Sequence, residues 1–130
     1  MTYDRDHYEE LIHHYFRAVV DERIEDVIDC FTADGQIQFA YMDAPARGRD
    51  ELRALYTAHV ARFRNHLDIA TRVVVQGDRA ISEIVFDAET PGGSPVHLEN
   101  CNIYEFREGK FQVVKVYLDT VTMTRQLAEA

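Results

Sequence analysis

The hydrophobic periodicity of the sequence changes near Asn65, and this change constrains the fold more than any other feature. Before it, apolar residues recur with the three- and four-residue spacing of amphipathic helices; after it, β-branched and aromatic residues fill runs separated by turn signals. The helical patterns cover residues 8–20, 24–31 and 50–63, and the strand patterns cover residues 36–42, 69–75, 79–89, 96–107 and 110–120. We therefore expect two helices, a short strand, a third helix and four further strands.

Short turn signals separate the last four expected strands, around Gly77, Gly92 and Gly109. Strands joined in this way pair as an antiparallel meander, and the three helices that precede them must cover one face of the sheet. The sequence predicts an α+β fold in which three N-terminal helices pack on a curved, mostly antiparallel sheet and form a cone with an internal pocket. Because no repeat, linker or low-complexity stretch divides the chain, we expect residues 1–130 to form a single domain.

The charge balance excludes several classes of partner. The chain has 14 basic and 23 acidic residues, a net charge of −9 with neutral histidines, so it offers no basic face to nucleic acid or to an anionic membrane. A charged N-terminal stretch and the lack of a long apolar window favour a cytoplasmic protein. Cys30 and Cys101 lie outside any CxxC motif, and His7, His13 and His14 are not spaced to share an ion. We expect no metal and no other cofactor.

Short motifs along most of the chain resemble the nuclear transport factor 2-like superfamily. They are the helical hairpin of residues 15–31, the Thr-Ala-Asp-Gly stretch that follows it, and residues 48–52, 75–80 and 107–111. The tail formed by residues 117–119 and 125–127 is similar to the SnoaL-like polyketide cyclase branch. The resemblance implies the cone fold. It does not imply one activity, because this fold carries isomerases, dehydratases, cyclases, epoxide hydrolases and non-catalytic modules.

The resemblance places Asp119 where SnoaL-type cyclases have an acid/base aspartate. A carboxylate at the mouth of an apolar cone is expected to have a raised pKa suited to proton transfer. The alternation of Val114, Val116 and Leu118 with polar neighbours instead places Asp119 on the opposite face of the strand. A bulge or the end of the strand would be needed to turn it inward, and a surface or capping role is the alternative.

Two histidines are candidates in the middle of the chain. His66 follows the third helix, where related dehydratases and SnoaL-like proteins direct a histidine into the cavity, and imidazole is a natural acid/base near neutral pH. The alternative for His66 is a loop residue in water. His59 lies on the apolar stripe of the third helix and is expected to be packed or partly buried, in contact with a ligand at most.

Polar residues of the first helix and of the strand at 96–107 are expected to face the pocket. Tyr15 lies on the buried stripe of its helix, where the related ketosteroid isomerases have an oxyanion-hole tyrosine; a core aromatic role is the alternative. Asn100, Asn102 and Tyr104 share one face of their strand. Asparagine is depleted in strands, so this face is expected to be a hydrogen-bonding pocket wall, with a solvent face or a subunit interface as alternatives.

This sequence lacks catalytic residues that two known mechanisms of the superfamily require. The general base of the isomerases falls on Phe39, which cannot accept a proton, although Asn102, near the second oxyanion donor, can still donate. The catalytic set of the limonene epoxide hydrolase type falls near Glu83, Val85 and Val116 and is incomplete. Phe39 therefore remains a candidate for contact with the ligand, and so does Tyr56.

These residues favour a cofactor-independent acid/base enzyme of the cyclase, isomerase or dehydratase type. Asp119 or His66 would move a proton on a small, largely apolar or aromatic carbonyl compound, while Tyr15 and Asn102 hold the enolate oxygen. Two alternatives remain: a protein that binds such a ligand without chemistry, and a dimerisation module. A homodimer through the open face of the sheet is compatible with all three.

Overall fold

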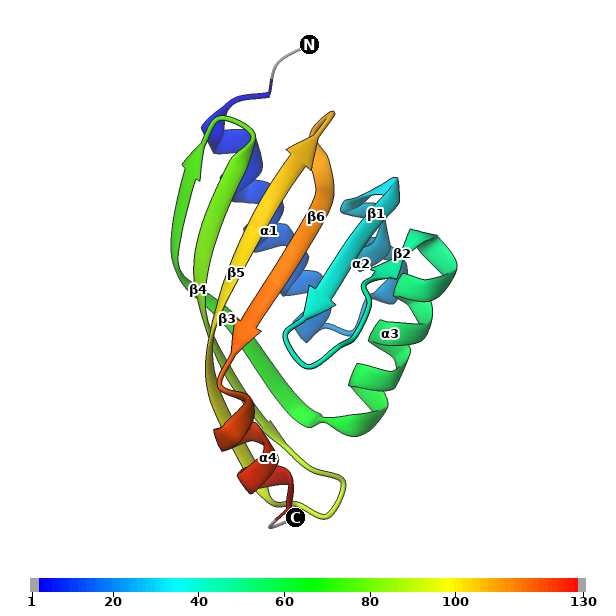
Figure 1. The fold of residues 1–130 in the computed structure, drawn as a ribbon, viewed down its shortest axis with the longest axis vertical. Coiled ribbons are helices and arrows are strands. Elements are labelled where there is room, and N and C mark those ends of the chain that lie inside the picture. The colour runs from blue at the N-terminus through cyan, green and yellow to red at the C-terminus, as the bar shows by residue number, and fades with distance from the viewer. Residues whose placement is uncertain (1–2, 129–130) are drawn as a thin grey trace.

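The computed structural model describes residues 3–128 and confirms the expected α+β architecture (Figure 1). The described elements are, in chain order, α1 (Arg5–Val20), α2 (Ile24–Asp29), β1 (Phe31–Phe39), β2 (Ala46–Arg47), α3 (Gly48–Arg62), β3 (Arg64–Gln76), β4 (Arg79–Glu89), β5 (Pro95–Arg107), β6 (Lys110–Leu118) and α4 (Thr120–Ala128). Residues 1, 2, 129 and 130 of the expected domain lie outside the described range. Within that range, no helix is long and apolar enough to cross a membrane.

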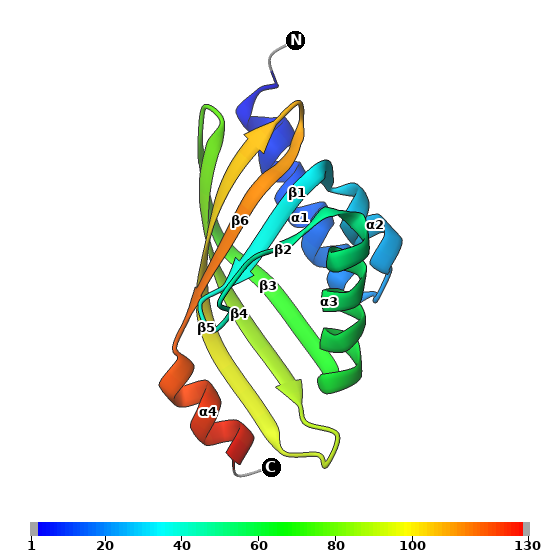
Figure 2. The same cartoon turned by 45° about the vertical axis from the view of Figure 1, so that its right-hand side comes forward.

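The strands form one curved, open sheet in the order β2-β1-β6-β5-β4-β3. Strands β3 to β6 pair antiparallel in sequence order, which confirms the expected meander, while β1 joins the far side of β6 in parallel. Figures 1 and 2 show α1, α2 and α3 on one side of this sheet, with α4 at its lower end. The cone is therefore closed by helices on one face and left uncovered on the other.

The inner face of the sheet and the helices share a core with two parts. The larger part packs α1 and α2 against the sheet through residues such as Ile12, Ile28 and Phe111, none of which is exposed. The smaller part, Phe63, Phe86, Ala88, Val96 and Leu98, packs against Met123 and Leu127 of α4. Burial alternates residue by residue along β4 and β5, as expected for strands with one covered face.

The N-terminal half of the sheet begins earlier than the sequence pattern indicated. Residues 31–35, expected to end the second helix and turn, already belong to β1, because Phe31 pairs with Phe111 of β6. Gly35 allows this pairing: a Cβ at that position would lie 2.8 Å from the carbonyl oxygen of Phe111. The register between Phe31 and Gln36 is irregular, which hides the strand from a period-two reading of the sequence.

Strand β3 begins at Arg64, several residues before the run expected at 69–75. His66 is therefore not a loop residue in water; it lies in a strand, and its side chain is 1% exposed. Asp68 pairs across the sheet with Phe86, whose side chain is buried in the core, so Asp68 also faces inward. The earlier start of β3 thus brings two titratable side chains to the inner face.

Candidate functional site

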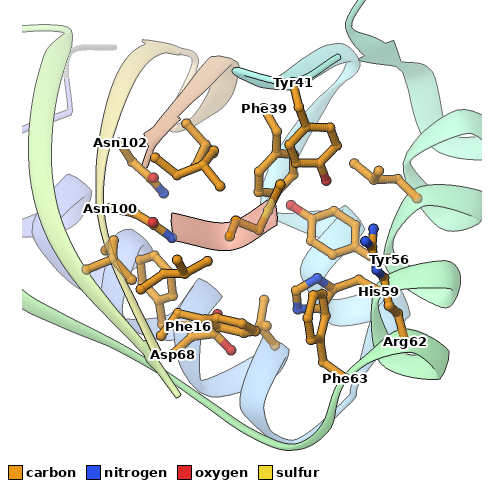
Figure 3. A pocket seen from close by; sticks show the side chains of 18 of the residues that line it. Phe16, Phe39, Tyr41, Tyr56, His59, Arg62, Phe63, Asp68, Asn100 and Asn102 are labelled. Carbon is orange, nitrogen blue, oxygen red and sulfur yellow. The ribbon is translucent and has the colours of Figure 1, made fainter. Parts of the chain in front are cut away.

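A cavity of about 230 Å³ lies between the inner face of the sheet and helices α1 and α3 (Figure 3). Its wall is mostly apolar and includes Phe16, Phe39, Phe63 and Phe86. Tyr41, which is 48% exposed and stacks on Phe39 with ring centroids 5.7 Å apart, marks the side open to solvent. A volume below the roughly 300 Å³ typical of drug-sized sites suits a compound of one or two rings.

Two tyrosine hydroxyls form a pair at one side of the cavity. The oxygens of Tyr15 and Tyr56 are 2.5 Å apart, and both side chains line the cavity although they are almost fully buried. Burial raises the pKa of both hydroxyls, so both stay protonated. One proton is shared between the two oxygens, and the other remains available to a further acceptor. Figure 3 shows the hydroxyl of Tyr56 directed into the cavity.

The amide side chains of β5 form the opposite wall, on the sheet side. Nδ2 of Asn102 donates to the hydroxyl of Tyr104 at 3.2 Å, and that hydroxyl is 2.7 Å from Oγ of Ser82. With its Nδ2 engaged, Asn102 keeps a buried Oδ1 that has no partner, and Oδ1 of Asn100 is in the same state. Buried acceptors without a partner cost stability until a donor reaches them. The wall is therefore suited to accept hydrogen bonds from a ligand.

Two histidines and an aspartate meet at the floor of the cavity. Nδ1 of His66 is 3.1 Å from Oδ2 of Asp68, and its Nε2 is 3.4 Å from Oε1 of Glu22 at the surface. The ring of His59 lies 5.6 Å from that of His66. His59 and Asp68 line the cavity, whereas His66 supports them from behind. Nε2 of His59 is buried and has no hydrogen-bond partner.

The surroundings of the two histidines move their pKa values in opposite directions. The hydrogen bond to Asp68 raises the pKa of His66, helped by the charge of Glu22. Burial lowers the pKa of His59, against the attraction of Asp68 and with the help of the charges of His66 and Arg62. The surroundings therefore favour the charged form of His66, beside Asp68, and the neutral form of His59. Pairs of groups whose pKa values are pushed apart in this way suit acid/base roles.

The same three side chains carry the donor types that suit a divalent transition metal. Among the described residues, His59, His66 and Asp68 bring three candidate ligand atoms within 4.8 Å of one another. Nδ1 of His66 and Oδ2 of Asp68 already bond to each other, however, and an ion held by both atoms would have to break that bond. As it stands, the cluster joins titratable side chains of the kind that can hold or transfer a proton.

Residues 12–114 match the family described as the SnoaL-like domain, which is more than half of the chain. The chain belongs to the SnoaL-like domain family. No curated protein matches the sequence of this SnoaL-like domain. The family explains the motifs noted in the sequence, from the helical hairpin to the turn at Glu108-Gly109.

Solved structures share the fold of this SnoaL-like domain at low sequence identity. A proposed SnoaL-like polyketide cyclase from Jannaschia sp. CCS1 is 14% identical, with a TM-score of 0.86 over 98% of this chain and 99% of that one. SalBIII, an epoxide hydrolase/cyclase-like enzyme of pyran ring formation in salinomycin, is 17% identical, with a TM-score of 0.82 over 92% and 95%. TerC, co-crystallised with polyporic acid, is 17% identical, with a TM-score of 0.82 over 92% of this chain and 96% of that one.

The structure brings together most of the residues proposed from the sequence. Six of the nine line the cavity: Tyr15, Phe39, Tyr56, His59, Asn100 and Asn102. Tyr104 lies behind the wall, where its hydroxyl fixes Asn102, and His66 lies behind Asp68. The ninth, Asp119, lies elsewhere.

Asp119 lies outside the cavity, in the surface and capping role that was the alternative for it. Strand β6 ends at Leu118, and Asp119 is exposed at the start of α4. Its Oδ1 accepts from the backbone N–H of Thr122 at 2.9 Å, and its Oδ2 accepts from the Thr122 hydroxyl at 2.6 Å. These bonds lower the pKa of Asp119 instead of raising it. The pleat of β6 continued to its end, and no bulge turned the carboxylate inward.

Replacing Asp119 by alanine should therefore affect stability and leave the cavity unchanged. We expect a small decrease in Tm, because an N-cap carboxylate stabilises the first turn of its helix. Ligand affinity and any catalytic rate should match wild type. Thermal denaturation and equilibrium binding on Asp119→Ala test this, and a loss of activity without a loss of stability would return the acid/base role to Asp119.

Two charged residues of the cavity wall, Asp68 and Arg62, were missed by the sequence reading. Asp68 follows His66 by two positions, the spacing that puts both on one face of a strand, but the strand was expected to begin only at residue 69. Arg62 ends α3 and lines the cavity, yet nothing in its local sequence separates it from a solvated helix end.

Proposed function

We propose that this protein is a cofactor-independent acid/base enzyme that moves a proton on a small, mostly apolar carbonyl compound. One observation carries the proposal: a neutral histidine with a free, buried Nε2 and a tyrosine hydroxyl line the same apolar cavity. The histidine is His59 and the hydroxyl is that of Tyr56. A base near an acidic carbon and a donor near the carbonyl oxygen are what enolate formation requires.

In this mechanism, His59 removes a proton from the carbon next to the carbonyl group. The imidazolium that forms is stabilised by the carboxylate of Asp68, which His66 holds in place. The hydroxyl of Tyr56 donates to the developing enolate oxygen and is supported by Tyr15. The enolate then takes the proton back at another carbon, expels hydroxide, or attacks a second carbonyl of the same molecule. These outcomes are isomerisation, dehydration and aldol cyclisation.

The comparisons support a small organic ligand for such a cavity. TerC was crystallised with polyporic acid, and SalBIII takes part in pyran ring formation. Both share only the fold with this chain, so the ligand class rests on the cavity itself. Its apolar wall and its few polar groups fit a carbonyl compound of one or two rings.

Hydrogen–deuterium exchange at carbon tests the proposal without knowledge of the substrate. The probe is 2-tetralone, a two-ring ketone with acidic protons next to its carbonyl, followed by NMR in D₂O. We expect wild-type protein to accelerate the exchange by about 100-fold or more over buffer. Added EDTA should leave the rate unchanged. Saturable binding of the ketone with no acceleration would instead favour the alternative of a binding protein without chemistry.

The pH dependence of that exchange should be bell-shaped. His59 acts as a base when neutral, and its lowered pKa places the acidic limb below pH 6.5. His66 stabilises Asp68 when charged, and its raised pKa places the basic limb above pH 6.5. Glu22, Asp68 and Arg62 are the charged groups that shift these limbs. His66→Gln should remove the basic limb and keep the acidic one, and a profile that keeps both limbs in His66→Gln would contradict the assignment.

The uncovered face of the sheet carries a second proposal, a homodimer. Apolar side chains that are one-third to more than one-half exposed gather on it: Leu67, Ile69, Val74, Ile81, Ile103 and Tyr117. Val74, Ile81 and Ile103 are direct neighbours on adjacent strands, and burial against a second copy would remove such side chains from water. We also propose that residues 1–130 form one domain and that the protein is cytoplasmic, in line with its two free cysteines.

A charge between Val74 and Ile103 on this face should prevent the homodimer. We expect wild type to sediment as a dimer and Ile81→Glu as a monomer, because the added carboxylate would be desolvated at the interface. Val121→Glu is the matched control, since Val121 is 74% exposed on α4, at the lower end of the sheet. A wild-type monomer in analytical ultracentrifugation would contradict this proposal and leave the cavity proposal untouched.

A further inference from the structure

Arg62 places a positive charge at the edge of the cavity. It is the last residue of α3, and its guanidinium lies over the ring of Phe63, 5.5 Å from the ring centroid. Among residues 3–128, no other arginine or lysine lines the cavity. Figure 3 shows Arg62 on the helix side, close to Tyr56 and His59. The side chain is thus held against an aromatic surface, with its charge next to the proposed reacting groups.

The charge of Arg62 has no anionic partner among the described residues. Nine other arginines of this acidic chain form ion pairs within 4.0 Å: Arg5, Arg17, Arg23, Arg47, Arg49, Arg53, Arg72, Arg79 and Arg107. The carboxylate of the cavity, Asp68, is bonded to His66. Arginine recognises carboxylates through paired N–H donors, and a free guanidinium beside an apolar cavity is suited to that role.

The opposite wall is suited to a hydrogen-bond donor on the ligand. Oδ1 of Asn100 and Oδ1 of Asn102 are buried acceptors without a donor, and Figure 3 shows both side chains across the cavity from Arg62. Only a hydrogen-bond donor satisfies these oxygens, and on an organic ligand of this size that donor is a hydroxyl or an N–H group. The space between the two walls is apolar.

We propose that the substrate of this cavity is a small carbonyl compound of one or two rings that also carries a carboxylate and a hydroxyl group. Its carboxylate pairs with Arg62 on the helix side, its ring fills the apolar centre, and its hydroxyl donates to Asn100 or Asn102 on the sheet side. This inference rests on the proposed function, because it takes the cavity as the substrate site, and it deepens that function by naming the substrate class.

Equilibrium binding of three matched compounds tests the two ends separately. They are 6-hydroxy-2-naphthoic acid, its methyl ester, which lacks the charge, and 2-naphthoic acid, which lacks the hydroxyl. At neutral pH we expect wild type to bind the hydroxy acid about tenfold more tightly than the ester, the effect of one charge-assisted pair. We expect the hydroxy acid to bind about fivefold more tightly than the acid without the hydroxyl.

Variants test whether Arg62 causes the preference for the acid and the asparagines cause the preference for the hydroxyl. Arg62→Gln should bind acid and ester equally, and Arg62→Lys should retain part of the preference. Arg64→Gln is the control: it removes an equal charge two residues away, from a side chain that bonds to the carbonyl of Pro91 outside the cavity. This variant should keep the full preference for the acid over the ester. Of Asn100→Leu and Asn102→Leu, the variant that removes the acceptor in use should abolish the preference for the hydroxyl. Because Arg62 is exposed, its replacement should leave Tm unchanged.

Three results would overturn the inference: equal binding of acid and ester by wild type, a preference for the acid that persists in Arg62→Gln, or no preference for the hydroxyl. Failure of the proposed function gives a different pattern, because binding needs no turnover. If the variants change the two preferences as expected while no proton exchange occurs, the ligand class is supported and the catalytic role is contradicted. If exchange depends on His59 while acid and ester bind alike, this inference alone falls.

Discussion

His59→Gln is expected to lose about 100- to 10,000-fold in the rate of proton exchange on a bound ketone, the range of general-base catalysis. Glutamine keeps the size and polarity of the side chain but accepts no proton at neutral pH. Affinity for the ketone should change little, because His59 contributes one of many contacts in the cavity. The measurement is the NMR exchange rate at saturating ketone, with the dissociation constant determined separately.

His14→Gln is the matched control for this variant. His14 lies on α1, does not line the cavity, and should give the wild-type rate. A His59→Gln protein that folds, binds the ketone and exchanges at the wild-type rate would remove His59 from the mechanism. Asp68 would then be the remaining base in the cavity, and Asp68→Asn would decide its role.

Tyr56→Phe should lower the rate of the same reaction by about 100- to 1,000-fold, as found when one donor to a developing oxyanion is lost. The variant also removes the partner of Tyr15, whose buried hydroxyl would then be unsatisfied. We expect a stability loss of about 1–3 kcal/mol from that unpaired group. Steady-state kinetics and chemical denaturation measure the two effects independently.

The double variant Tyr15→Phe/Tyr56→Phe separates stability from catalysis. Removing both hydroxyls leaves no orphaned partner, so part of the lost stability should return. The rate should stay as low as in Tyr56→Phe, since the donor to the oxygen is still absent. Recovery of the rate together with stability would show that Tyr56 acts through the fold alone.

The regular parts of the fold could be predicted from local patterns. The apolar stripe of α1 and the alternation along β4 and β5 arise from burial on one face, which the spacing of residues reports directly. β4 was expected over residues 79–89 and is found there, and the tight turns fixed the antiparallel order of β3 to β6. These elements depend on neighbours that are close in sequence.

The parts of the fold that differ from the prediction depend on contacts between segments that are far apart in the sequence. The start of β1 is fixed by pairing with β6, which comes last among the strands. Helix α4 was missed, although Asp119 at its N-cap and Met123 and Leu127 on one side are recognisable signals. The expected strand over residues 110–120 ran into these residues. The acid/base role expected for Asp119 came from the resemblance, whereas the alternation along the strand had placed its side chain on the opposite face.

Part of the site was also accessible from the sequence. Two asparagines on one face of a strand indicated a polar wall, and Tyr15 on a buried stripe indicated a hydroxyl at the cavity. The different positions of His59 and His66 could not be predicted from the sequence. They depend on which ring reaches the cavity and which is held by Asp68 and Glu22. Burial and hydrogen bonding across elements decide such roles.

The most direct test of the account is an NMR titration of the individual histidines, assigned with His59→Gln and His66→Gln. We predict a pKa below 6.5 for His59, because burial disfavours its charged form, and a pKa above 6.5 for His66, because Asp68 and Glu22 favour its charged form. This result would show a neutral base at the cavity wall and, behind it, a histidine whose charged form is favoured by its carboxylate neighbours. A His59 that is already protonated at neutral pH would contradict the proposed base.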